Sequence, residues 1–300
     1  MKTLLSYLMI FLLLFAFSCK SGPKNLDTFV PVFSTYNNDS TGAKVRAEKY
    51  EIFYGILTPV EVSSIFNRLN VPYNRAKLNP TSNRDMYLSS SKASINTGIY
   101  GVDFGYLKIF DIGQEMIDYM MTISDMSNKL GIPYKFITDP IKRIESDMSE
   151  PDTIMALMNK AFANMENHLR ADGRESTAGL MVMGGWVEAM FIATQLAYDP
   201  LKPDPEVVQK IAEQKYTLTS LLSFMKNYYD DPVVVYYTKK LRFLKNYFDT
   251  FDIYFKKGDL EIDTTKQILR SSGSEMTVTV ETLNKIRDYV NKLRTEMVTP

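Results

Sequence analysis

The segment 176–198, "STAGLMVMGGWVEAMFIATQLAY", constrains the fold more than any other part of the chain. It is long, it is apolar, and it contains a single charged side chain, Glu188. Its length and composition would also suit a membrane span. However, the charge lies at its middle, two adjacent glycines interrupt it, and the flanking segments are amphipathic. A helix that is apolar on every side is normally wrapped by other helices. We therefore predict that 176–198 is the central helix of a folded domain.

The rest of the chain also has the start and stop signals of helices. A Thr-Pro-x-Glu capping box lies at 58, and Ser or Asp precedes Pro near 149, 204 and 230. The expected helices cover 58–69, 86 or 91 to 110, 112–130, 149–170, 204–229, 230–255 and 281–297. Two β-rich runs around Ser-Ser-Gly-Ser predict a small β-hairpin near 266–280.

These elements predict a mainly α fold, an irregular multi-helix bundle with helical hairpins. An α-solenoid of the tetratricopeptide type is the alternative, because 101–132 has the small and aromatic residues of one such hairpin. That pattern does not recur at a fixed period, as a repeat array requires. We therefore favour the bundle and expect one helical domain over 44–300.

The N-terminus has the three parts of a secretory signal. Lys2 is followed by an apolar run over 4–17 and then by Ser18 and Cys19. The apolar run is shorter than the roughly 20 residues that a membrane-spanning helix needs. Because it ends in Ser-Cys, it is similar to a bacterial lipoprotein signal.

The resemblance to lipoprotein signals implies a signal peptide over 1–18 and a lipid such as palmitate on Cys19. The polar segment 19–43 would then tether the domain to a membrane. Ala16 and Phe17 stand where the pattern usually has Leu and a small residue. An ordinary signal peptide and a retained N-terminal anchor are the alternatives.

The chain has few residues for metal binding or nucleophilic catalysis. Cys19 is its only cysteine and His168 its only histidine. These counts argue against transition-metal clusters, thiol catalysis and a Ser-His-Asp triad, so we predict no metal and no cofactor. His168 is expected near a helix C-terminus, where a protonated imidazole suits the helix dipole. The net charge is zero and no basic stripe alternates with aromatic residues, so nucleic acid is not an expected partner.

Three residues of the helix ending near 110 are candidates for ligand binding. Asn96, Tyr100 and Asp103 are spaced by four and three, so they share one helical face. A mixed polar and aromatic face suits a helix that lines a pocket. It equally suits a helix whose polar groups meet a neighbouring core helix, which we consider the simpler interpretation.

Glu188 is the second candidate, together with Trp186. A carboxylate in an apolar helix must be paired, hydrogen-bonded or protonated. If the helix that carries Asp103 packs against 176–198, the two carboxyl groups could share one cleft. Two carboxyl groups can divide the acid and base roles in glycoside hydrolysis. A structural anchor is the alternative role for Glu188, and we favour it.

The segment 228–257 combines many tyrosines and phenylalanines with lysines. Displayed aromatic rings would suit a carbohydrate or peptide surface. The alternative is a core stripe with lysines outside it. The spacing favours this alternative, with a stripe of Leu241, Leu244, Phe248, Phe251 and Phe255.

The lipoprotein-like signal, the polar tether and a helical body around "GIYGVDFGYL" and "GGWVEAMFIATQLA" resemble lipoproteins of Bacteroidetes-type bacteria. The resemblance implies a location in a Gram-negative cell envelope, and it supplies no catalytic residue. Lys20, in place of Asp after the cysteine, fits sorting to the outer membrane. The acidic run associated with export to the cell surface is missing, so we prefer the periplasmic leaflet.

The function that we expect is a non-enzymatic, membrane-anchored envelope lipoprotein whose helical domain binds a protein or small ligand. An envelope hydrolase that uses Asp103 and Glu188 is one alternative. A structural subunit of an envelope complex is another.

Overall fold

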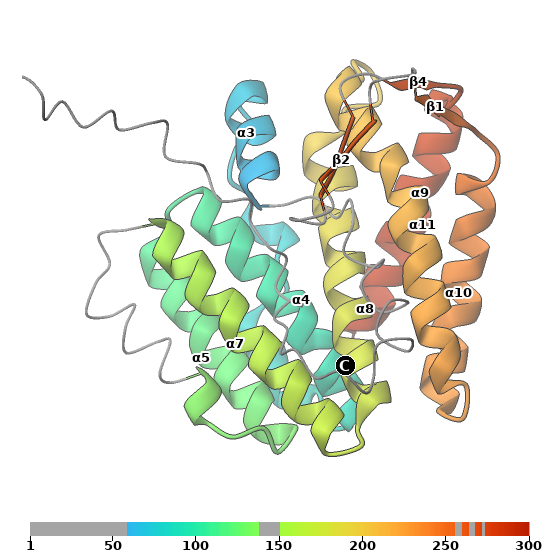
Figure 1. Cartoon of the computed structure of the whole chain (residues 1–300). Helices are drawn as coiled ribbons and strands as arrows, with labels where there is room; N and C mark the ends of the chain where they lie inside the picture. The colour runs from blue at the N-terminus through green and yellow to red at the C-terminus, as the bar shows by residue number, and fades with distance from the viewer. Residues whose placement is uncertain (1–58, 138–150, 256–259, 264–267, 272–273, 300) are drawn as a thin grey trace, which may run out of the picture.

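A computed structural model (Figure 1) describes residues 59–137, 151–255, 260–263, 268–271 and 274–299. The predicted signal peptide, Cys19, the tether and the first part of the predicted domain lie outside the described residues. The fold is mainly α, as the sequence predicts. Its long helices are α3 (Pro59–Leu69), α4 (Ser90–Ile109), α5 (Gly113–Lys129), α7 (Pro151–Ala171), α8 (Glu175–Ile192), α9 (Pro205–Met225), α10 (Pro232–Phe248) and α11 (Val280–Val298). Short helical turns are η2 (Arg75–Lys77), η3 (Thr81–Met86), η4 (Ala193–Ala197, a π-helix) and η5 (Lys226–Tyr228).

The helices form a bundle around α8. In Figure 1, α4, α5 and α7 lie on one side of α8, and α9, α10 and α11 lie on the other. The most extensive helix pairing is between α4 and α8, although α5 and α7 lie between them in the sequence. Helix α11 packs against both members of this pair. In a solenoid each repeat contacts only its neighbours along the chain. The arrangement is therefore the multi-helix bundle that the sequence favours.

Helix α8 is the central helix predicted from its composition. Met181, Met183 and Val187 are completely buried, and Glu188 with them. Within the described residues, Glu175–Ala197 is the one helical segment long and apolar enough to cross a membrane. In its most apolar window, 78% of the residues are buried inside the bundle. Its apolar character is therefore accounted for by helix packing.

Two glycines set the close approach of α4 and α8. A Cβ atom added at Gly98 would overlap the carbonyl oxygen of Met181, and one added at Gly184 would overlap the carbonyl oxygen of Ile95. Backbone atoms cannot move aside as a side chain can. Glycine at these two positions therefore permits the helix contact on which the central pair depends.

Helix α10 is shorter than predicted. It ends at Phe248, and β1 (Ile253–Phe255) follows a few residues later. The prediction of a helix to about 255 is therefore wrong. Phe251 is 2% exposed, so it reaches the core from the turn that follows the helix. Its spacing of three from Phe248 continued the helical pattern and concealed the turn. The core stripe is confirmed at the residues whose burial is described, Leu241, Leu244, Phe248 and Phe251.

The small β-structure is real, but its strands pair differently from the prediction. Strand β1 pairs with β4 (Ser274–Met276), and β2 (Leu260–Asp263) pairs with β3 (Ile268–Ser271), both antiparallel. The two β-rich runs that flank Ser-Ser-Gly-Ser therefore pair with upstream segments and not with each other. The prediction paired the two runs within 266–280 with each other and did not include the upstream strands β1 and β2 as partners.

Candidate functional site

The fold brings the two candidate carboxyl groups together. Asp103 comes from α4 and Glu188 from α8, and both are 0% exposed. A third charged residue, Arg294 of α11, joins them and is 8% exposed. We call Asp103, Glu188 and Arg294 the carboxyl–arginine cluster. It lies where the three helices meet at the centre of the molecule.

Glu188 and Arg294 form a two-pronged ion pair. The Nε of Arg294 lies 2.9 Å from Oε2 of Glu188, and its Nη2 lies 3.0 Å from Oε1. Arg294 Nη2 also donates to the carbonyl oxygen of Lys77 at 3.0 Å, and its guanidinium lies 4.5 Å from the ring centre of Phe191. Burial lowers the pKa of Arg294, but the charge and hydrogen bonds of Glu188, together with Asp103 and Tyr87, raise it by more, so the net shift is upward. The pair thus satisfies the need of a buried charge for a partner.

Asp103 lies beside this ion pair and is hydrogen-bonded through one of its two carboxyl oxygens. Its Oδ2 accepts a hydrogen bond from the backbone N–H of Asn79 at 3.0 Å, but its buried Oδ1 meets no donor among the described residues. Burial and the neighbouring Glu188 raise the pKa of Asp103 well above 3.8, and Arg294 only partly opposes them. A proton on Asp103 would allow its carboxyl group to donate a hydrogen bond to Glu188. The cluster then holds one negative and one positive charge.

Asn79 connects this cluster to the segment before α4. Its side-chain amide donates to Oδ1 of Asn96 at 3.1 Å, and its own Oδ1 accepts from the hydroxyl of Tyr87 at 3.1 Å. Its carbonyl oxygen accepts from the hydroxyl of Tyr119 at 2.8 Å. The residue is 0% exposed, so its amide and carbonyl groups are satisfied within the protein. Asn79 therefore holds the connection between η2 and η3 in the core.

The remaining candidates on α4 belong to the same network. Tyr100 is 0% exposed and donates to the carbonyl oxygen of Pro80 at 2.9 Å. Asn96 donates to the carbonyl oxygen of Met297 at 3.0 Å, near the end of α11. The predicted shared face of Asn96, Tyr100 and Asp103 thus exists, and it faces a packed, hydrogen-bonded interior.

Trp186 lies apart from Glu188. Its indole N–H donates to the hydroxyl of Thr217 on α9 at 2.9 Å. Positions two apart on a helix point in different directions, and Glu188 is turned toward α11. The two candidates of α8 therefore do not form a joint site.

His168 lies near the C-terminal end of α7, in agreement with its predicted place. Its Nε2 lies 3.3 Å from a carboxylate oxygen of Asp172, and its ring packs edge-on against Phe136 at 5.8 Å between centres. In the part of the chain that the structure describes, no group of three or more His, Cys, Asp or Glu side chains is arranged to hold a metal ion.

A surface hollow of about 350 Å³ lies between the first turns of α4 and α10. Ser91, Lys92, Pro232, Tyr236 and Tyr237 are among the residues that line it. None of the candidate ligand residues Asn96, Tyr100, Asp103, Trp186 and Glu188 lines this hollow. The Lys92 ammonium is directed to the last turn of α11, where it donates to the carbonyl oxygen of Glu296 at 3.0 Å.

Sequence reasoning missed Arg294 and Asn79. Arg294 follows Leu293 and lies eight residues after Ile286, beside the apolar stripe of α11. A basic residue at that position could have indicated a buried partner for Glu188. No comparable signal marks Asn79, because an asparagine before a proline is typical of an exposed turn.

No family model, no curated protein and no solved structure matches the chain. An acid–base pair acts on a substrate only when water and substrate reach it. Here both carboxyl groups are sealed between helices, and the cluster is arranged to join α4, α8, α11 and the η2–η3 connection.

Proposed function

We propose that the protein is a lipid-anchored lipoprotein of the bacterial cell envelope. In this proposal Cys19 carries the lipid, and the helical domain binds a protein or small ligand through its surface and performs no catalysis of its own. The single observation that supports the non-catalytic part is the state of Asp103 and Glu188. Both are 0% exposed, and each is hydrogen-bonded within the protein.

The sequence supports the anchor. Cys19 follows a short apolar run and Ser18, and the domain contains no other cysteine. Two or more acyl chains hold a protein durably at a membrane, because each buried CH₂ group contributes about 0.8 kcal/mol. An envelope hydrolase that uses Asp103 and Glu188 would need an opening of α4 from α8. A structural subunit of an envelope complex would share the anchor and the closed domain.

Metabolic labelling with palmitate tests the anchor. The full chain, produced in a bacterium that makes lipoproteins, is expected to incorporate the label and to remain with the membrane fraction. The Cys19→Ala variant is expected to lose the label completely, because no other thiol is present. Ser21→Ala, two residues away, is the matched control and should be labelled like the parent. Persistent labelling of Cys19→Ala would contradict the proposal.

A further inference from the structure

The outward face of α10 and α11 displays a group of aromatic rings, two of them exposed and two packed against the edge of the core. Tyr236 and Phe243 are each 49% exposed, and Tyr247 and Tyr289 are half-buried beside them. The ring centres of Phe243 and Tyr289 lie 5.1 Å apart, and those of Phe243 and Tyr247 lie 5.6 Å apart. An exposed group of rings on adjacent helices is typical of an interaction surface. We call Tyr236, Lys239, Arg242, Phe243, Tyr247 and Tyr289 the α10–α11 face.

This face is also basic. The 17 residues of α10 include Lys239, Lys240, Arg242 and Lys245 and no acidic residue, although the whole chain carries 35 basic and 35 acidic residues. Lys240 is paired with Glu296 at 2.7 Å and Lys245 with Asp249 at 2.6 Å. Lys239 and Arg242 remain as exposed cations.

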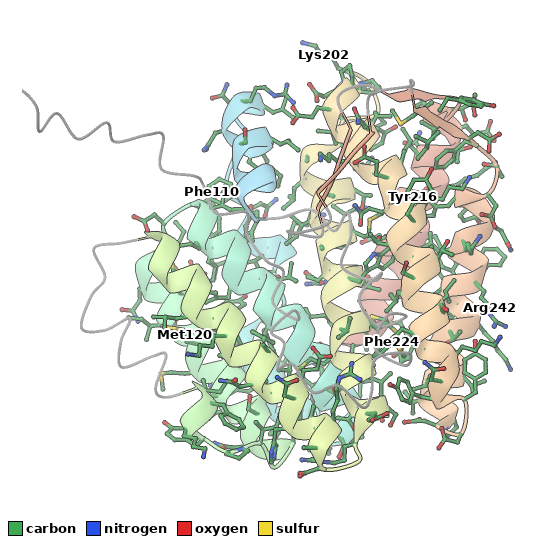
Figure 2. The ribbon with its side chains drawn as sticks, viewed as in Figure 1. Phe110, Met120, Lys202, Tyr216, Phe224 and Arg242 are labelled. Carbon is green, nitrogen blue, oxygen red and sulfur yellow. The ribbon has the colours of Figure 1, made fainter. Side chains whose placement is uncertain are left out.

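Arg242 lies at the outer edge of the molecule and is directed away from the bundle (Figure 2). Its Nη2 donates a hydrogen bond to the hydroxyl oxygen of Tyr229 at 2.7 Å. On α11, Glu281 is paired with Lys285, and the exposed Asp288 has basic neighbours at Arg287 and Lys292. The free charge of the face is therefore positive.

The packing of the rings disfavours a flat sugar as the occupant. Phe243 and Tyr247 meet at 84°, and Tyr247 and Tyr289 meet at 73°. Phe243 and Tyr289 are closer to parallel, at 32°, so the three rings form an uneven surface and not one continuous flat platform. Tyr and Phe rings beside Lys and Arg match the boundary of an anionic bilayer, where the rings enter the headgroup layer and the cations meet lipid phosphates.

The length of chain before α3 makes such a contact possible without a special geometry. Thirty-nine residues lie between Cys19 and Pro59. A chain of that length can reach at most about 140 Å, so the connection between Cys19 and α3 does not by itself fix which face of the domain meets the membrane. Tethering also keeps the domain at a high effective concentration near the bilayer. A weak attraction is then sufficient to orient it.

We propose that the α10–α11 face lies against the anionic surface of the bilayer that holds the lipid anchor. This inference rests on the proposed anchor at Cys19. Phe243 and Tyr236 enter the headgroup layer, and Lys239 and Arg242 bind lipid phosphates. The opposite side of the bundle, formed by α5 and α7, is directed to the aqueous compartment.

Site-directed spin labelling of the full lipidated protein tests the orientation. Once Cys19 carries lipid, a single introduced cysteine is the only free thiol. Asn246→Cys places a nitroxide on the exposed side of α10, and Asn128→Cys places one on the exposed side of α5 as the matched control. The protein is reconstituted into vesicles of phosphatidylethanolamine with phosphatidylglycerol, and into vesicles of phosphatidylcholine alone. The measurement is the accessibility of each nitroxide to oxygen and to a water-soluble nickel chelate.

In the anionic vesicles we expect the label at 246 to favour oxygen over nickel and the label at 128 to favour nickel. The double variant Lys239→Glu and Arg242→Glu should reduce the protection at 246 at least tenfold, because each basic residue contributes to the attraction. The double variant Lys135→Glu and Lys202→Glu, with the same change in charge at exposed sites elsewhere, should leave it unchanged. Circular dichroism of all variants confirms that they remain folded.

Equal nickel accessibility at 246 and 128, in protein that floats with the vesicles, would overturn the orientation while leaving the anchor intact. Protection that is equally strong on phosphatidylcholine, or that survives the charge reversal at Lys239 and Arg242, would also overturn it. A free thiol at Cys19 would overturn the anchor and the orientation together.

Discussion

Asp103 shows how strongly burial changes one residue in this protein. The same side chain on the surface would be ionised at neutral pH, but between α4 and α8 it lies beside the Glu188 carboxylate. Arg294 can balance only one of the two negative charges. The pKa of Asp103 is therefore raised, by burial first and by Glu188 second. The folded structure therefore favours the protonated form of Asp103 more than the unfolded chain does.

This proton predicts a pH-dependent stability. Because the folded state binds it more tightly than the unfolded state, stability is greatest below the usual pKa of 3.8 and is lost as the pH rises toward the folded pKa. The loss from one group is at most about 1.4 kcal/mol per pH unit. Asp103→Asn keeps the shape and a hydrogen-bond donor but has no proton to lose. We expect its free energy of unfolding in urea to exceed that of the parent increasingly above pH 4.

The exposed Asp118→Asn on α5 is the control for that experiment and should follow the parent at every pH. Parallel curves for the parent and Asp103→Asn would show that Asp103 is ionised in the folded protein. The raised pKa of Asp103 in the folded protein would then be contradicted.

At the scale of the elements, the sequence signals located helix starts well and helix ends less well. Asp204 and Asp231, each before a proline, accept hydrogen bonds from the first free N–H groups of α9 and α10. These are local interactions, so their signature is local. The end of α10 depends on where Phe251 can reach the core, which is a property of the packed molecule. The contact between α4 and α8 likewise depends on two glycines that lie far apart in the sequence.

The central contact predicts a difference between two glycine substitutions. At Gly98 an added methyl group meets the backbone of α8, so Gly98→Ala should lower the free energy of unfolding by about 1–3 kcal/mol or more. At Gly113 nothing lies within 4 Å of the added atom. Gly113→Ala should be neutral or stabilising by up to about 1 kcal/mol, because alanine has the higher helix propensity. Urea unfolding of both variants measures the difference, and equal losses would contradict the close approach of the helices.

At the scale of the whole molecule, α11 closes the bundle. Arg294 joins it to α8, across 106 positions of the sequence. Side chains near the start of α4 donate hydrogen bonds to the last backbone carbonyl oxygens of α11. Lys92 donates to that of Glu296, Asn96 to that of Met297, and Tyr87 to that of Val298. These contacts satisfy the free carbonyls that any helix end leaves. The end of α11 is therefore fixed to the central helix pair.

Removal of Arg294 should have a large effect that a second change reverses. Arg294→Met leaves the Glu188 carboxylate buried beside Asp103 without its cation, which should cost about 3–5 kcal/mol of stability. The double variant Arg294→Met and Glu188→Met removes both charges and should recover most of this loss. Lys245→Met, which breaks an exposed pair with Asp249, is the control and should cost at most about 1 kcal/mol. A double variant no more stable than Arg294→Met would show that the ion pair does not join α8 to α11 in this way.

The sequence by itself determined the features that depend on near neighbours along the chain. These are the helical class, most helix starts, the central place of 176–198, and the shared face of Asn96, Tyr100 and Asp103. Only the tertiary structure decided what that face meets. Arg294 lies 191 residues beyond Asp103 in the numbering, and no spacing rule connects two such positions. Its arrival beside Glu188 follows from how α11 packs on α4 and α8. That packing encloses a carboxyl pair that the sequence alone could equally have placed in an open cleft.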